Sequence, residues 1–163
     1  MLDFSQMLTR FAVALVLGAI MGLERESAGK EAGVRTGMLV AGGAALFTIA
    51  GLALPHLLST NPGTVENIIS NNAGVFGVIA NIVVGIGFIG GGIIIKTTER
   101  VHGLTTAAVV WVMAAVGMLA ALGLMEFAAV ATVVSAGILF ILRKLGIYEL
   151  VKPKNAPSSE EFR

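Results

Sequence analysis

The chain has 163 residues, of which 56% are apolar and only 13% are charged, with a formal net charge of +1. Soluble domains carry about 25% charged residues, so this composition excludes a soluble globule of this size and indicates a membrane protein. The chain has no cysteine, which excludes disulfides and thiolate metal sites, and its two histidines are too few for a His-rich metal cluster. The near-neutral charge gives no reason to expect a nucleic-acid partner.

Five apolar runs are candidates to cross a hydrocarbon core of roughly 30 Å as helices. In chain order they cover about residues 4–23, 36–54, 75–95, 104–122 and 127–142. We expect Pro55 to end the second helix, and the flanks of the short fifth run to extend it. No A-x-A cleavage site follows the first run, and charged residues lie where cleavage would fall, so we expect this run to be retained.

These runs predict an all-α fold, a polytopic membrane bundle of five transmembrane helices in one domain, residues 1–146. Residues 147–163 are polar and contain proline, so we expect a disordered cytoplasmic tail. The loops 24–35 and 96–103, together with the segment from residue 143, hold ten Lys and Arg residues, whereas the other side holds only Arg10. This split predicts an N-terminus outside and a C-terminus in the cytoplasm.

The third run contains "VVGIGFIGGG", in which Gly85, Gly87 and Gly90 match the dinucleotide fingerprint G-x-G-x-x-G. That fingerprint needs a soluble βαβ unit and an acidic residue about 20 positions further on. Here the glycines lie inside an apolar run, and Val110 stands at the position of the acidic residue. The motif therefore does not indicate a nucleotide site.

Small residues in a membrane helix allow neighbouring backbones to approach closely. In the third run they fall on two sides, so we expect this helix to be central, sandwiched between two neighbours, and we expect Gly85→Leu to disrupt assembly. Two alternatives stay open: unwinding of residues 85–92, and a pore or pocket lined by exposed backbone. The helix-packing candidates are Gly18, Gly22, Gly77, Gly85, Gly87, Gly90, Gly91 and Gly92.

Four predicted helix ends meet on the cytoplasmic side and bring polar residues together. Thr36 and Thr105 are expected N-caps of the second and fourth helices. Glu24 and Glu26 follow the C-terminal end of the first helix, where the helix dipole disfavours anions. Arg25, Arg35 or a bound cation such as Mg²⁺ would compensate them. The candidate polar or ion site is Glu24, Arg25, Glu26, Arg35, Thr36, Asn81, Thr105 and Thr106, with Glu24 and Glu26 as candidate metal ligands.

Other interpretations of these residues remain open. The acidic pair is compatible with a solvated interfacial loop, with a buried ion pair or with a cation site. Asn81, within the third run, is expected either to hydrogen-bond across helices or to line a solute path. No nucleophile and base of the Ser/His kind can be paired, so we expect no catalytic residues and no enzyme activity.

The blocks "GLERE", "GVRTGMLVAGGAALF", "GIGFIGGGIII" and "VHGLTTAAVVWVMAAVGM" resemble, in this order, the MgtC/SapB family of bacterial inner-membrane proteins over residues 8–125. The chain departs from the family pattern where Gly37 replaces His and His102 replaces Arg, and it resembles a short form without the C-terminal soluble domain. Asn81 and Gly77 also stand where Gln and Arg are common. The family motif positions are Glu24, Arg25, Glu26, Gly33, Arg35, Thr36, Gly85, Gly87, Phe88, Gly90, Gly103, Leu104, Thr105, Thr106 and Trp111.

The resemblance implies a multi-pass protein of the bacterial inner membrane with a role in adaptation to low Mg²⁺ and, in pathogens, in survival inside macrophages. Some members resemble regulators of other membrane proteins, including P-type Mg²⁺ pumps and the F-type ATP synthase. We therefore expect a regulatory protein, with a small oligomeric transporter or channel for Mg²⁺ or another solute as the alternative. Beyond lipids, we expect a homo-oligomer, preferentially a dimer, and no cofactor other than Mg²⁺.

Overall fold

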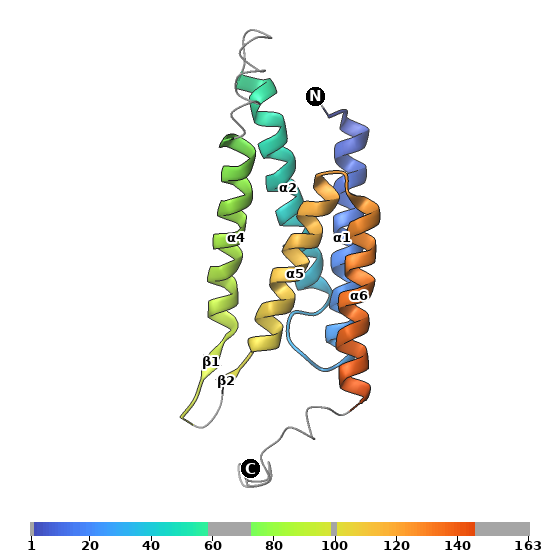
Figure 1. Ribbon diagram of the computed structural model, residues 1–163, viewed down its shortest axis with the longest axis vertical. Helices are drawn as coiled ribbons and strands as arrows, with labels where there is room; N and C mark the ends of the chain where they lie inside the picture. The colour runs from blue at the N-terminus through green and yellow to red at the C-terminus, as the bar shows by residue number, and fades with distance from the viewer. Residues whose placement is uncertain (1, 59–72, 99–100, 146–163) are drawn as a thin grey trace.

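The computed structural model describes residues 2–58, 73–98 and 101–145, and these residues form a bundle of long helices (Figure 1). All five of the described long helices are long and apolar enough to cross a membrane, which confirms the predicted membrane bundle. The tail at 147–163 lies outside the described residues. The helices are α1 (Phe4–Ser27), α2 (Val34–Leu58), α4 (Ala73–Ile93), α5 (Leu104–Ala121) and α6 (Met125–Lys144), and the two-residue strands β1 (Ile95–Lys96) and β2 (Val101–His102) pair antiparallel.

The start of the described chain and the end of α6 lie at opposite ends of the bundle, as an odd number of spans requires (Figure 1). The loop after α1 and the β1–β2 hairpin lie at the end where α6 finishes (Figure 1). We call this the hairpin end. Its assignment to the cytoplasm rests on the distribution of Lys and Arg and stays a prediction.

The observed helix starts correct the two expected N-caps. Because α2 begins at Val34, Thr36 lies inside its first turn. Because α5 begins at Leu104, its N-cap is Gly103, with a left-handed φ of 83°. A side chain at Gly103 would also collide with the backbone of Ile93 at the end of α4. A residue without Cβ is therefore required there, and threonine cannot take this position.

Pro55 does not end the second helix, contrary to the expectation from sequence, because α2 continues to Leu58. Proline removes one backbone hydrogen bond and crowds the preceding turn. Pro55 stands only three residues before the end of α2, so few helical bonds are affected. Membrane helices tolerate proline where neighbouring groups compensate for the lost bond.

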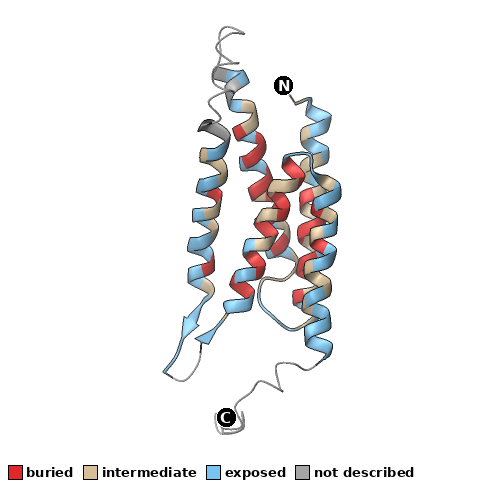
Figure 2. Cartoon of the chain, viewed as in Figure 1, coloured by how far each residue is buried: buried red, intermediate tan, exposed pale blue. Residues whose placement is uncertain are grey.

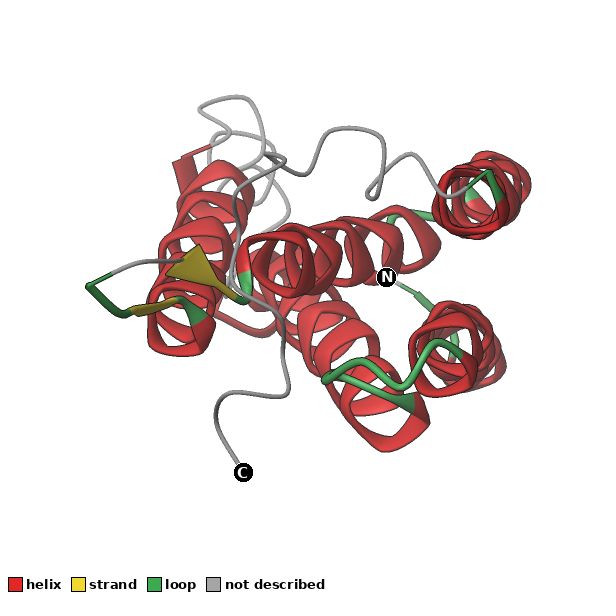
Figure 3. Ribbon diagram, turned by 90° about the horizontal axis from the view of Figure 1, so that it is seen from below, coloured by secondary structure: helices red, strands yellow, loops and turns green. Residues whose placement is uncertain are grey.

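The central helix is α5 and not α4, which corrects the prediction for the third run. In the part of the chain that the structure describes, 56% of the α5 span is buried against only 17% of the α4 span (Figure 2). Helix α5 packs against α1, α2, α4 and α6, whereas α4 packs mainly against α2 and α5. Seen along the bundle, the strands that join α4 to α5 lie at one edge (Figure 3).

The closest helix crossings occur at glycines of α1, α2 and α5. A Cβ at Gly18 would lie 2.8 Å from Ala41 Cβ, and one at Gly22 would lie 2.6 Å from the Cα of Val34. Two glycines that the sequence did not indicate complete these crossings. Gly37 faces the backbone of Gly18, and Gly117 of α5 faces the backbone of Ala41. The bundle is therefore held by direct backbone approach, as expected where helices pack in lipid.

Helix α4 is continuous to Ile93, so residues 85–92 are not unwound. Its inner face carries Ile82 and Gly90, and Gly90 is in ordinary contact with Ala107 of α5. Five other glycines in the described part of α4 do not pack against this chain, which corrects the expectation of a helix pressed from two sides. A Cβ would meet nothing within 4 Å at Gly77, Gly85, Gly87, Gly91 and Gly92.

At the end of the bundle opposite the hairpin end, Asp3 and Arg10 form polar contacts. At the start of α1, the Ser5 hydroxyl donates to Asp3 Oδ2 at 2.8 Å, which with the Phe4 backbone lowers the pKa of the exposed Asp3 carboxyl. Arg10 does not snorkel into water, because its Nη1 donates to the Ala121 carbonyl oxygen at 2.6 Å. Arg10 therefore satisfies a C-terminal carbonyl of α5, where the helix dipole favours a cation.

Replacing Arg10 with leucine is expected to lower the free energy of unfolding by about 1.5–3 kcal/mol, because a hydrogen bond to a charged group is lost. Denaturant titration in mixed micelles measures this change. The control is Lys30→Gln, which removes one positive charge from an exposed loop. Equal stability of the two variants would show that the Arg10 contact does not hold α1 to α5.

Candidate functional site

A buried arginine joins α1 to α5 at the hairpin end of the bundle. Arg25 is only 5% exposed, and its Nη2 donates to Thr106 Oγ1 at 3.1 Å. Its Nε is buried with no hydrogen-bond partner. Helix α1 reaches this point because it continues through Ser27, beyond the expected end near residue 23. Of the predicted polar residues, Arg25 and Thr106 are thus brought into direct contact.

Glu24 points toward α6, which the sequence did not indicate. Its Oε1 lies 3.8 Å from Arg143 Nη1, and its side chain is 8% exposed. Arg143 is more exposed and also lies over the ring of Phe140, with 5.4 Å from its Cζ to the ring centroid. The second oxygen of Glu24 is buried and unpartnered. A long ion pair with one exposed partner contributes little stability, so the position of Glu24 is not explained by this pair alone.

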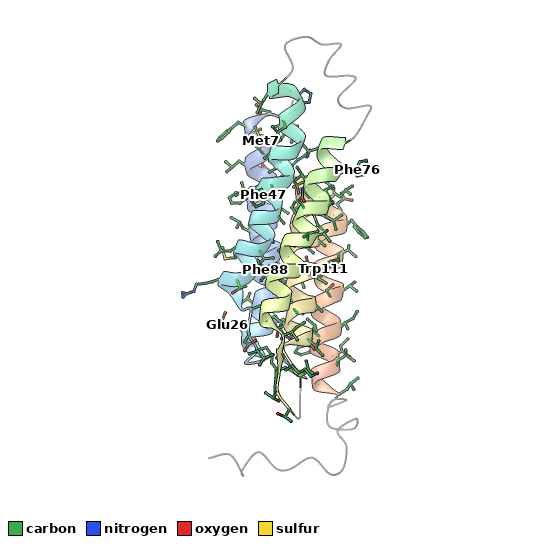
Figure 4. All side chains as sticks on the ribbon, turned by 90° about the vertical axis from the view of Figure 1, so that its left-hand side faces the viewer. Met7, Glu26, Phe47, Phe76, Phe88 and Trp111 are labelled. Carbon is green, nitrogen blue, oxygen red and sulfur yellow. The ribbon has the colours of Figure 1, made fainter. Side chains whose placement is uncertain are left out.

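Glu26 accepts a hydrogen bond from the N-terminal end of α2. Its Oε2 accepts a hydrogen bond from the Val34 backbone N–H at 3.0 Å, one of the groups that a helix N-terminus leaves without an internal partner. Figure 4 shows Glu26 at the hairpin end. A Cβ at Gly33 would lie 2.7 Å from the same oxygen, so a larger residue there would require the Glu26 side chain to shift. The positive end of the α2 dipole, and not Arg35, therefore balances this carboxylate.

The carboxylates of Glu24 and Glu26 have different partners in this structure. Glu24 faces Arg143 of α6, whereas Glu26 is bound to the backbone of α2. Within residues 2–58, 73–98 and 101–145, no group of three or more His, Asp or Glu side chains could hold a metal ion. Mg²⁺ takes oxygen ligands in near-octahedral geometry and is often held by only one or two carboxylates, so Mg²⁺ at Glu24 or Glu26 stays a prediction.

The remaining predicted residues form no ion pair or side-chain hydrogen bond with this cluster in the described part of the chain. Arg35 and Thr105 are exposed, and neither forms an ion pair or side-chain hydrogen bond in the described part of the chain. Asn81 is also exposed, and its amide has no hydrogen-bond partner in the described chain, so it does not link helices within one copy.

Asn81 and Thr36 lie in a groove between α2 and α4, which we call the α2–α4 groove. Its volume is about 720 Å³ and its walls are almost entirely apolar. The lining comes from Thr36, Leu39, Val40, Gly43, Ala44 and Phe47 of α2 and from Val78, Asn81, Ile82, Gly85, Ile86 and Ile89 of α4.

Residues 11–147 match the MgtC family. The chain belongs to the MgtC family. It is 41% identical to Protein MgtC of Brucella abortus over 134 residues, which cover 82% of this chain and 50% of that protein. It is 38% identical to Protein MgtC of Salmonella typhimurium over 134 residues, again 82% of this chain and 51% of the relative.

A third relative is an uncharacterized protein of Synechocystis, 35% identical over 159 residues, which cover 98% of this chain and 62% of that protein. The chain thus spans about half the length of the curated MgtC proteins that it matches. No solved structure matches the chain. The family match includes the Arg25–Thr106 contact and both walls of the α2–α4 groove.

Proposed function

We propose that this chain is a regulatory protein of the bacterial inner membrane, linked to Mg²⁺ homeostasis and low-Mg²⁺ adaptation, that acts by contacting another membrane protein. Membership of the MgtC family, which is linked to Mg²⁺ homeostasis, supports the proposed role in Mg²⁺ homeostasis. The contact mechanism rests on the exposed side of α4.

Helix α4 presents an apolar face to the outside of the bundle. Phe76, Val84 and Phe88 lie at helical spacing and are 64%, 71% and 85% exposed. Figure 4 labels Phe76 and Phe88 on α4. Gly87 and Gly91 lie beside them, with nothing within 4 Å of a Cβ placed there. We define these five residues as the outer face of α4. In lipid, such a face favours a partner helix, because small residues allow close approach and large residues fill the partner's grooves.

The positions of the charges support a regulator over a transporter. In the described helices, ionisable side chains lie within the first or last two turns, and α4 and α5 carry none. Ion pathways through membranes are normally marked by ionisable residues inside the spans. The α2–α4 groove is apolar apart from Thr36 and Asn81, so it is poorly suited to a hydrated cation.

Transport of Mg²⁺ or another solute by an oligomer is the second candidate. It is favoured by Glu24 and Arg25, each of which has a buried polar atom without a partner. In that case purified protein in liposomes would carry a solute flux that falls on Asn81→Leu or Glu24→Gln. We expect instead no Mg²⁺ flux above that of empty liposomes, and robust flux lost in these variants would reject the regulatory proposal.

The contact itself is tested by photo-crosslinking in cells grown at low Mg²⁺. A photoreactive residue in place of Phe88 is expected to capture a second, larger membrane protein. The matched control replaces Val134 of α6, which is 53% exposed. Capture from both positions, or from neither, would contradict a specific contact at the outer face of α4, and capture of a second copy would make this face the homodimer contact.

Gly91→Leu is the corresponding functional variant. It is expected to leave folding intact, because the new side chain meets no neighbour in this chain, and to abolish growth support at low Mg²⁺. Gly137→Leu, the same change at an open position of α6, is expected to retain function. Normal growth with Gly91→Leu at equal protein level would count against the outer face as the contact surface.

A further inference from the structure

The α2–α4 groove has the length of one half of the bilayer. On each wall, the lining residues extend over twelve positions, or eleven helical steps, from Thr36 to Phe47 and from Val78 to Ile89. At a rise of 1.5 Å per residue this is about 16 Å, roughly half of a hydrocarbon core of 30 Å. Thr36 and Ile89, at one end of the lining, lie close to the hairpin end of the bundle, where α2 begins and α4 finishes.

Two glycines leave space unfilled in the α2–α4 groove. Gly43 of α2 and Gly85 of α4 both line the groove, and a Cβ at either position would meet nothing within 4 Å. The space beside these residues is therefore not filled by this chain. An apolar hollow of about 720 Å³ is within the size range of ligand sites.

Two exposed basic residues lie at the hairpin end, next to the segments of α2 and α4 that line the groove. Arg35 precedes Leu39 and Gly43 by one and two i+4 steps, so it shares their stripe on α2 at the hairpin end. Lys96 lies on β1, just after α4 at the same end. Both are exposed, and the ion pair found in the described residues, Glu24–Arg143, uses neither of them.

We propose that the α2–α4 groove binds one acyl chain of an anionic phospholipid, with the phosphate at Arg35 and Lys96. The acyl chain fits an apolar groove that is one leaflet long. The arginine guanidinium is suited to paired hydrogen bonds with phosphate oxygens, and the lysine adds a second positive charge. Basic pockets at the ends of membrane helices are common sites for anionic lipid headgroups.

A second copy of the chain fits the same groove less well. A two-fold axis along the membrane normal would place the same residues of both copies opposite each other at the same depth. The two Arg35 side chains would then approach without a carboxylate among the residues that line the groove. Like charges at an interface oppose association, whereas a lipid phosphate neutralises them.

Native mass spectrometry of the full chain, titrated with phosphatidylglycerol or phosphatidylcholine, tests this proposal. Retention of phosphatidylglycerol is expected to exceed that of phosphatidylcholine, and Arg35→Gln is expected to weaken it about five-fold. Lys30→Gln, which removes an exposed loop charge at the same end, is the matched control. It is expected to change retention by less than about two-fold.

A second test fills the groove with a side chain. Gly43→Leu is expected to weaken phosphatidylglycerol retention at least about five-fold, because the side chain occupies the hollow, while Gly137→Leu on α6 leaves it within about two-fold. Equal retention in Arg35→Gln and Lys30→Gln, or in Gly43→Leu and Gly137→Leu, would overturn the proposal. So would loss of a dimer in Gly43→Leu with lipid retention unchanged, which would make a second copy the occupant.

Discussion

Gly117→Leu is expected to prevent formation of a stable bundle. A Cβ at Gly117 would lie 2.7 Å from the carbonyl carbon of Ala41 and 2.8 Å from its Cα. These are backbone atoms of α2, which cannot rotate away as the end of a flexible side chain can. Leucine raises helix propensity by about 1 kcal/mol relative to glycine, but overpacking at this crossing is expected to cost about 3 kcal/mol or more. The net effect is a large destabilisation.

Gel filtration after heating, together with denaturant titration in micelles, measures this effect. The control is Gly137→Leu, the same substitution at an α6 position where a Cβ meets nothing within 4 Å. That variant gains helix propensity without a clash, so its stability is expected to equal or exceed that of the parent chain. Comparable stability of the two variants would contradict a close backbone contact between α2 and α5 at Gly117.

The second large effect concerns the buried contact between α1 and α5. Thr106→Val keeps the shape of the side chain but removes the acceptor for Arg25 Nη2, leaving a buried guanidinium with fewer partners. The free energy of unfolding is expected to fall by about 1.5–3 kcal/mol. Replacing both residues, with Arg25→Met and Thr106→Val, is expected to restore most of this loss, because no unpaired charge is then buried.

A double-mutant cycle over Arg25→Met and Thr106→Val measures the coupling directly. Thr105→Val is the matched control, because Thr105 is the adjacent but exposed threonine. Its effect is expected to stay within about 0.5 kcal/mol. If the cycle shows no coupling, or if both threonine variants behave alike, Arg25 is not held by Thr106.

The membrane bundle could be predicted from sequence because the length of an apolar run is a local property. The helices α1, α5 and α6 begin within two residues of the predicted runs, and α1 ends four residues later than expected because charged residues can form the last turn of a membrane helix. Pro55 was misjudged for the related reason that the cost of proline depends on how much helix follows it.

The order of the helices in space could not be predicted in the same way. Glycine content pointed to α4 as the central helix, but a glycine is equally acceptable where a helix faces lipid and no neighbour approaches. In α5 the close approach to α2 depends on Gly117, the single glycine of this helix. The alanines and valines around it are small enough for α5 to have neighbours on all sides. Which of two small-residue helices is enclosed depends on helix register, and one sequence does not contain that information.

In the candidate site, too, the general location was predictable but the individual contacts were not. The sequence predicted that Glu24, Arg25, Glu26 and Thr106 lie at one end of the bundle, and this is where they lie. It did not identify Arg143 as the neighbour of Glu24, because that contact depends on the register of α6 against α1. The bond from the Val34 N–H to Glu26 could have been anticipated only with the start of α2 known.

The arrangement of α4 is tested most directly by oxygen accessibility of nitroxide spin labels in lipid nanodiscs. The chain has no native cysteine, so single cysteines can be placed freely. In the monomeric fraction, labels at Phe76, Val84 and Phe88 are expected to collide readily with lipid-dissolved oxygen, whereas labels at Ile82 of α4 and Met113 of α5 are shielded. Uniformly low accessibility along α4 would contradict an edge helix with a free outer face, and with it the contact mechanism proposed for this protein.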